Sequence, residues 1–171
     1  MEQININDAQ KLIKPDIYVL VTTLDKDDKP NAIGVSWITR TSIKPFLILI
    51  SIDSRRYSYE GIKKHQEFVV NYPAEDQKDD AWYCGVNSGR TVDKFKETGL
   101  KLTKSKNVRV PTIIGSKVSF ECKLISQFDT GDHTVFVGEV VNTSTDLKKK
   151  AHLYVSAGAN LISLDINGNS I

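Results

Sequence analysis

Hydrophobic positions in this chain fall into short runs separated by polar turns, a pattern typical of β-strands. The runs are rich in Val, Ile, Thr, Tyr and Phe, the residue types that favour strands. They cover residues 17–23, 31–39, 46–52, 68–72, 116–127, 134–142 and 161–166. Gly131 and Asp132 mark the turn between the two longest runs. We predict a strand for each run.

The first strands are expected to pair locally. The polar stretch 25–30 separates runs 17–23 and 31–39, as in an antiparallel hairpin with a longer loop. In run 46–52 the odd and the even positions are both mainly apolar. Because successive side chains of a strand point to opposite faces, this predicts a strand buried on two faces. Gly34 lies inside its run and indicates a bulge or a close approach of the backbone to a neighbouring group.

Three short helices are predicted between the strands. The first covers 59–65, with Ser58 as its N-cap. The second begins after Pro73 and ends near Gly85, and the third covers 92–98. Because strands follow strands and helices appear only as insertions, we expect a mainly antiparallel barrel with two or three appended helices rather than a parallel sheet.

The richest cluster of polar chemistry follows run 46–52 directly. Ser51, Ser54, Arg55, Arg56 and Ser58 stand together at the start of the first predicted helix. Hydroxyls donate hydrogen bonds, guanidinium groups bind oxyanions, and the free N–H groups of a helix start favour negative charge. The cluster therefore predicts an anion site. The alternative, in which the arginines are solvated and Ser58 only caps the helix, stays open from composition alone.

A second anion cue lies in residues 88–94. If Thr91 caps the third helix, Lys94 falls in its first turn, where a cation opposes the helix dipole by about 0.3–1 kcal/mol. This position is better explained if Lys94 faces a negative ligand. The alternative is a surface lysine paired with Glu97, three residues further on.

Composition narrows the function classes. The chain has 171 residues, 40% of them hydrophobic and 26% charged, which is enough for one domain with a sizeable core. The net charge is +2 and the only basic run is 148–150, so no nucleic-acid face is expected. Cys84 and Cys122 do not form a disulfide framework, which favours a reducing, cytoplasmic setting. Neither a signal pattern nor an apolar run of about 20 residues is present, so we expect no membrane association.

The usual catalytic motifs do not occur. We find no Gly-x-Gly-x-x-Gly, no Gly-x-x-x-x-Gly-Lys and no Gly-x-Ser-x-Gly pattern. His65, His133 and His152 are scattered without metal-ligand spacing, so no metal site is predicted. An apolar barrel with an anion pocket and no catalytic constellation indicates that a bound cofactor supplies the chemistry.

Several short segments in a fixed order resemble the flavin reductase-like, FMN-binding split-barrel family, and within it the flavoredoxin-like branch. The resemblance runs from about residue 18 to 141, and it is the order and spacing of the segments that make it specific. The matching segments are 20–23, 31 with 35–37, 51–59, 68–71, 82–85, 88–90 with 93–95, 99–100, 121–122 and 131–133 leading into 137–140.

The resemblance implies a fold, a cofactor and an assembly. The fold would be an antiparallel Greek-key split β-barrel that forms a single domain over 1–171, and it would bind FMN non-covalently. The protein would be a homodimer with the pocket completed near the subunit interface. The expected cofactor-binding residues are Asn31, Ser36, Trp37, Ser51, Ser54, Arg56, Tyr57, Ser58, Ser88, Arg90 and Lys94.

Individual roles follow from the resemblance and from the chemistry of the side chains. Arg56 and Ser58, where the family usually has Thr, would bind the phosphate. Asn31 has an amide that can both donate and accept, which suits the polar edge of the flavin. Trp37 would flank the ring, although its ordinary interpretation is a half-buried core aromatic. His133 is the single candidate catalytic residue; the alternative for it is a surface or capping role.

The resemblance implies an oxidoreductase in which bound FMN accepts a hydride from NADH or NADPH. The electrons would pass to free flavin, ferric iron, a quinone or another protein. An alternative is a flavoredoxin-like electron carrier without direct nicotinamide activity. A ligand-free interaction module is the third reading.

Overall fold

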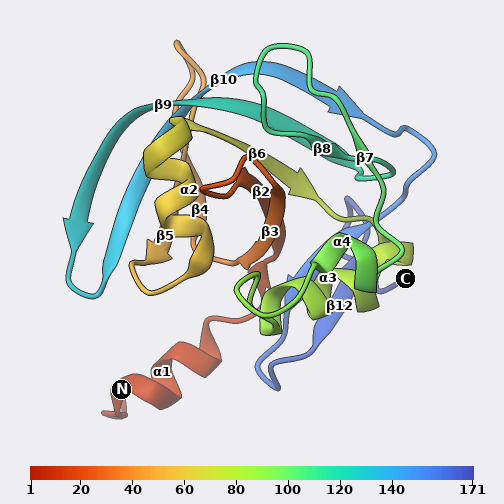
Figure 1. Ribbon diagram of the computed structural model, residues 1–171. Helices are drawn as coiled ribbons and strands as arrows, with labels where there is room; N and C mark the ends of the chain where they lie inside the picture. The colour runs from red at the N-terminus through yellow and green to blue at the C-terminus, as the bar shows by residue number, and fades with distance from the viewer.

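A seven-stranded antiparallel sheet, curled on itself, forms the body of the protein (Figure 1). The computed structural model describes all 171 residues. The strand order is β3-β2-β6-β9-β10-β5-β4. The strands are β2 (Val19–Leu24), β3 (Pro30–Val35), β4 (Ile38–Ser42), β5 (Leu47–Asp53), β6 (Glu67–Tyr72), β9 (Val118–Thr130) and β10 (His133–Thr145). The expected mainly antiparallel barrel is confirmed, and so is the first hairpin, in which β2 pairs with β3.

The barrel is split between its two edge strands. β3 and β4 are consecutive in the chain, with only Ser36 and Trp37 between them, yet they do not pair with each other. The prediction of one strand over 31–39 was therefore wrong. The backbone turns at Ser36, whose carbonyl accepts from the N–H of Ile38 at 3.1 Å, and β4 then pairs with β5 instead.

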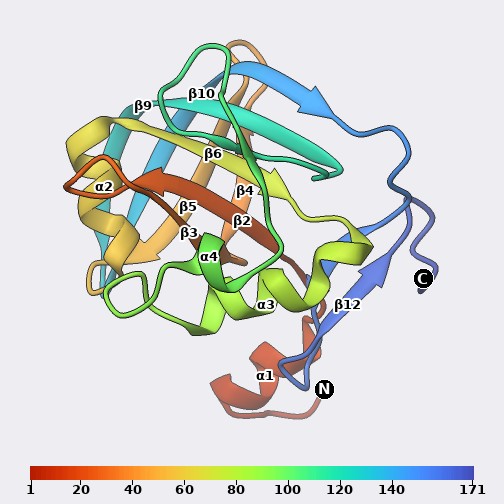
Figure 2. The ribbon, with the colours of Figure 1, turned by 45° about the vertical axis from the view of Figure 1, so that its right-hand side comes forward.

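Short helices and two small sheets complete the fold. The helices are α1 (Ile6–Leu12), α2 (Tyr57–His65), α3 (Lys78–Val86) and α4 (Lys94–Glu97), with a 3-10 turn η1 (Glu75–Gln77). β1 (Asp16–Ile17), β11 (His152–Val155) and β12 (Leu161–Leu164) form one small sheet, and β7 (Leu102–Thr103) and β8 (Thr112–Ile113) the other. α1 has no buried residue and projects from the body (Figures 1 and 2). None of the helices is long and apolar enough to span a membrane.

Two helix starts differ from the prediction. α2 begins at Tyr57 and its N-cap is Arg56, so Ser58 lies within the first turn instead of capping it. α4 begins at Lys94 and is capped by Asp93, whose carboxylate accepts from the N–H of Lys96, so Thr91 is not a cap. Asp is a stronger N-cap residue than Thr, which explains the later start of α4.

The core fills the barrel and extends under α3. On β5 the residues Ile48, Ile50 and Ile52 are buried, whereas Leu47 and Leu49 are only half-buried. The prediction that this strand is buried on both faces was wrong, because the elements packed against β5 are strands and no helix covers its outer face.

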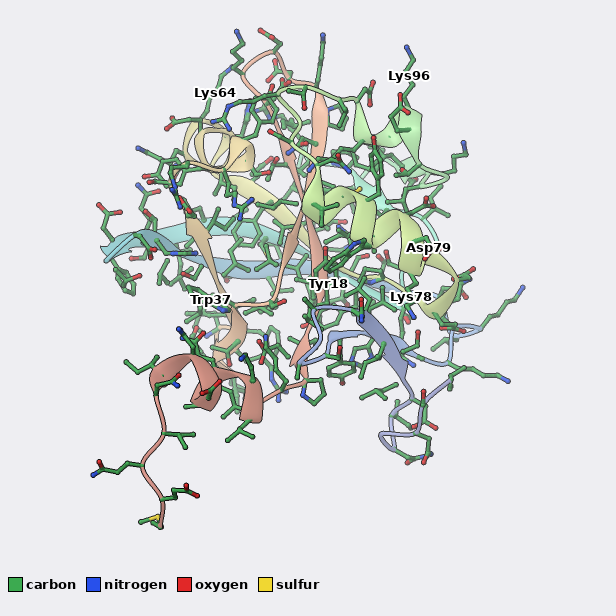
Figure 3. The ribbon with its side chains drawn as sticks, turned by 90° about the horizontal axis from the view of Figure 1, so that it is seen from below. Tyr18, Trp37, Lys64, Lys78, Asp79 and Lys96 are labelled. Carbon is green, nitrogen blue, oxygen red and sulfur yellow. The ribbon has the colours of Figure 1, made fainter.

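The predicted close approach at Gly34 is confirmed. A Cβ atom placed on Gly34 would lie 1.9 Å from the Tyr18 Oη atom and 3.0 Å from the Cα atom of Gly85. The Tyr18 hydroxyl donates to the Ala81 carbonyl at 3.1 Å, which ties α3 to the hairpin (Figure 3). The absence of side chains at Gly34 and Gly85 therefore lets α3 lie directly on β3, beside the split in the barrel.

Candidate functional site

Two adjoining cavities lie at the split of the barrel, between β3, β5, the start of α2 and the end of α3. Their volumes are about 430 Å³ and about 190 Å³. They share the lining residues Ile33, Asp53, Arg56 and Gly85, so they form one continuous groove.

The structure brings together all but one of the residues predicted from the sequence. The first cavity is lined by Asn31, Arg56, Tyr57, Ser58, Ser88, Arg90 and Lys94. The second is lined by Ser36, Trp37, Ser51, Arg56 and His133. Ser54 lines neither cavity, because the turn that leads into α2 leaves it exposed.

The start of α2 presents an uncompensated positive corner to the groove. Arg56 occupies the N-cap without making a side-chain cap hydrogen bond, and its guanidinium has no ion-pair partner. In the first helical turn the N–H of Tyr59 donates to the Arg56 carbonyl at 3.1 Å, whereas the N–H groups of Tyr57 and Ser58 have no acceptor within the helix. Ser58 is buried, and its Oγ atom accepts from the Asn31 amide at 2.7 Å, which leaves its own proton free to donate. This corner can bind an oxyanion.

Arg55, which the sequence placed in the anion cluster without naming it as cofactor-binding, and Asp53, which the sequence did not predict, also line the groove. Arg55 Nη2 donates to Asp53 Oδ2 at 2.6 Å, and its Nε to Asp53 Oδ1 at 3.0 Å. These hydrogen bonds hold the pKa of the Asp53 carboxyl far below its ordinary value. Asp53 is the only carboxylate that lines either cavity, and Arg55 neutralises it. The remaining charged side chains that line the two cavities, Arg56, Arg90 and Lys94, are positive.

Arg90 reaches the groove from the loop after α3. Its Nη1 atom donates to the Arg55 carbonyl at 2.9 Å, and its guanidinium lies 5.5 Å from the centre of the Tyr57 ring. The Tyr57 hydroxyl donates to Asp25 at 2.9 Å. Gly89 lets this loop lie close to Asn31 and Tyr57. A Cβ atom at residue 89 would lie 2.4 Å from Asn31 Oδ1 and 2.6 Å from Tyr57 Cδ1.

Lys94 is buried, with 4% of its surface exposed, although it lines the groove. Its Nζ atom donates to the carbonyls of Ala32 at 2.6 Å and Cys84 at 2.7 Å. It makes no ion pair with Glu97, so the surface-pair alternative was wrong. Burial lowers the pKa of the Lys94 ammonium to about 8.

Trp37 and His133 form an aromatic wall in the second cavity. Their ring centres are 4.4 Å apart with planes tilted by 36°. Trp37 is 57% exposed, so the interpretation as a half-buried core residue was wrong. His133 Nδ1 lies 2.6 Å from Asp132 Oδ1, which fixes the orientation of the imidazole. An indole that remains exposed beside a groove offers a flat apolar surface to a planar ligand.

These features fit one kind of ligand. The unpaired Arg56 and the helix start suit a phosphate, and the aromatic wall suits a planar ring. The Asn31 amide, which can both donate and accept, suits a polar ring edge.

Residues 15–160 match the family model described as a flavin reductase like domain. The chain is 32% identical over 152 residues to an uncharacterized protein of Archaeoglobus fulgidus, covering 84% of each chain. It is 30% identical over 135 residues to the reductase subunit HsaB of a flavin-dependent monooxygenase from Rhodococcus jostii, covering 79% of this chain and 66% of that one.

Solved structures share the fold. Flavoredoxin of Desulfovibrio vulgaris superposes with a TM-score of 0.85 at 24% identity, covering 96% of this chain and 93% of the other. An FMN-binding protein from Thermus thermophilus superposes with a TM-score of 0.84 at 23% identity, covering 95% of each chain. At these identities the superpositions establish the split-barrel architecture alone.

Proposed function

The chain belongs to the flavin reductase-like family, and from this premise we propose that it is an FMN-binding oxidoreductase. The observation that carries the proposal is the uncompensated positive corner at the start of α2, which adjoins an aromatic wall at the split of the barrel. When bound, FMN would supply the redox chemistry by accepting a hydride from NADH or NADPH and passing electrons to an acceptor. The protein would supply binding, orientation and charge.

The phosphate would lie at the α2 corner. Arg56, the first-turn N–H groups and the Ser58 hydroxyl would hold a dianion at once, and each charge-assisted hydrogen bond contributes about 1.5–3 kcal/mol. Arg90 is held next to the same corner by the Arg55 carbonyl and would add to its positive charge.

The ring would lie along the split of the barrel. Asn31 and Ser36 line the two cavities and would hydrogen-bond its polar edge, and Trp37 would exclude water from one face. His133 packs on Trp37 and would hold the indole in position at the reacting side of the groove.

The exposed Trp37 also supports assembly as a homodimer. A large aromatic residue with 57% of its surface exposed at the edge of the groove would be covered by a second copy, which would complete the pocket. Two relatives are named as reductase components of flavin-dependent monooxygenases, which supports a partner protein or free flavin as the electron acceptor.

Absorption spectroscopy with bound-flavin stoichiometry tests the cofactor proposal. We expect a yellow protein that takes up one FMN per chain, and a colourless protein with no FMN uptake would refute it. Anaerobic mixing with NADH and with NADPH then tests the donor. Bleaching by either nucleotide supports a reductase, whereas reduction only by a protein donor would replace it with the electron-carrier alternative.

A further inference from the structure

Lys94 is a buried cation without a carboxylate partner. Its ammonium contacts only backbone carbonyls, one from β3 and one from α3, and makes two of its three possible hydrogen bonds there. The charged or titratable groups that act on it are the Cys84 thiol and the Arg56 guanidinium. Burial raises the pKa of Cys84 to about 11, so that thiol is uncharged at neutral pH. No carboxylate of the protein forms an ion pair with this ammonium.

Tethering β3 to α3 does not by itself require a positive charge. An amide or a hydroxyl would satisfy a backbone carbonyl without the free-energy cost of burying an ion. Lys94 lines the first cavity and also an adjoining pocket that includes Asp25 and Asp93, and its remaining donor makes no hydrogen bond within the protein. A buried, unpaired cation on a cavity wall indicates that a bound ligand places negative charge there.

The groove has two positively charged regions of different character. Arg56 is solvent-exposed, so a phosphate dianion bound to it could keep part of its hydration. Lys94 is buried beside β3, where its ammonium contacts the Ala32 carbonyl. FMN in its oxidised form carries its charge on the phosphate, but uptake of two electrons and one proton leaves a negative charge on the ring. The buried cation therefore suits the ring in its reduced state.

We propose that the Lys94 ammonium is the counter-charge for the ring of reduced FMN, so that the protein binds the reduced cofactor more tightly than the oxidised one. This inference rests on the proposed function and adds redox-state selectivity to it. Lys94 thereby sets the reduction potential of the bound flavin, because charge near the ring tunes its electronics.

The test compares four proteins: wild type, Lys94→Met, Lys94→Gln and Lys96→Met. Lys96 is exposed on the same short helix and points away from the body, so it is a matched control (Figure 3). Lys94→Gln keeps a donor for the carbonyls if Lys94→Met does not fold. Affinities are measured for oxidised FMN, for chemically reduced FMN under anaerobic conditions and for oxidised riboflavin, together with the midpoint potential.

We expect both Lys94 variants to lose at least tenfold affinity for reduced FMN and no more than about threefold for oxidised FMN. If the affinity for reduced FMN falls tenfold relative to the affinity for oxidised FMN, the two-electron midpoint potential of the bound flavin falls by about 30 mV. Lys96→Met should behave as wild type.

Equal losses for oxidised and reduced FMN would overturn the proposal and leave Lys94 a positioning residue. A loss of more than threefold for oxidised FMN that oxidised riboflavin does not share would also overturn it, because Lys94 would then bind the phosphate. Wild-type protein that binds flavin in neither state would refute the proposed function itself, and the inference with it.

Discussion

At the scale of single residues, the site depends on where positive charge is buried and where it is exposed. Arg55 is neutralised by Asp53, Arg56 is exposed and unpaired, and Lys94 is buried and unpaired. The three cations therefore differ in the free energy with which they can bind an anion. A surface ion pair is weak, whereas a cation beside a helix start or in a dry cavity binds an anion strongly.

Arg56 and Ser58 should control affinity through the phosphate. We expect the double variant Arg56→Glu/Ser58→Ala to weaken FMN binding about 100-fold or more, since two charge-assisted contacts are lost at about 1.5–3 kcal/mol each. Riboflavin, which lacks the phosphate, should bind both proteins alike. Lys63→Glu, at the exposed far end of α2, serves as the charge control. Unchanged FMN affinity, measured by fluorescence titration, would show that the phosphate site is elsewhere.

Lys94 should make the stability of the flavin-free protein rise with pH. Its pKa is about 8 when folded and 10.5 in the reference state, so between these values the unfolded chain binds more protons and folding is favoured as pH increases. From pH 7.5 to 9.0 we expect Lys94 to contribute a gain of about 1 kcal/mol to the free energy of unfolding, relative to a variant without the ammonium. The raised pKa values of Cys84 and Cys122 act in the opposite direction as the pH approaches 9 and rises above it, in both proteins alike.

Urea denaturation of wild type and Lys94→Met at the two pH values measures this contribution. The pH-dependent gain should vanish in the variant. If both proteins respond to pH in the same way, the ammonium is not held at the buried position that the structure gives it.

At the scale of elements, the groove exists because α3 lies close to β3. Tyr18, which directly precedes β2, fills the space between them, and Gly34 and Gly85 leave room for its hydroxyl. Gly85 also lines both cavities, so the same contact that packs the helix shapes the site. The fold thus places the end of α3 and the loop with Ser88 and Arg90 opposite the start of α2.

Gly85→Ala tests this packing. In an ordinary helix the change would stabilise by about 0.5–1 kcal/mol. Here the new Cβ atom would lie 2.1 Å from the Tyr18 Oη atom, and we expect a net loss of about 1–3 kcal/mol from overpacking.

The background Tyr18→Phe provides the control. Without the hydroxyl, the nearest remaining Tyr18 atom in the contact is Cζ at 3.3 Å, so the cost of Gly85→Ala should fall by at least half. Urea unfolding of the four proteins gives the coupling directly. An equal cost in both backgrounds would contradict the contact.

At the scale of the whole molecule, two apolar clusters support the groove. One fills the barrel and includes Phe68, Cys122 and Phe136. The other lies between the hairpin, α3 and the β11–β12 pair, and includes Leu20 and Cys84. The groove lies where the two layers meet, so the walls of the site belong to rigid elements from both.

The two thiols report on these clusters. Both cysteines are fully buried and unpaired, and burial raises both thiol pKa values. We expect both to react with a disulfide reagent at pH 8 at least about 100-fold more slowly in the native protein than in urea, because exposure requires an opening of the fold. Single Cys→Ala variants assign each rate. Fast labelling of Cys84 alone would show that the α3 layer opens independently of the barrel.

Much of the fold followed from local patterns. Strand periodicity predicted the β2–β3 hairpin and the long pair β9–β10, and Gly34 predicted a close backbone contact. The polar cluster before α2 identified an anion corner, because a helix start with adjacent hydroxyls and guanidiniums attracts negative charge wherever it lies. Helix starts were less predictable, since several residues near each start were suitable caps.

The sequence alone thus determined most strands of the main sheet, the class of fold and the chemical character of the site. Only the tertiary structure decided that the chain breaks at Ser36, that Trp37 stays exposed and that Lys94 is buried without a counter-ion. These properties depend on which segments distant in the chain come together. Strand pairing and the contact of α3 with β3 set them, and a local pattern of residues carries no information about either.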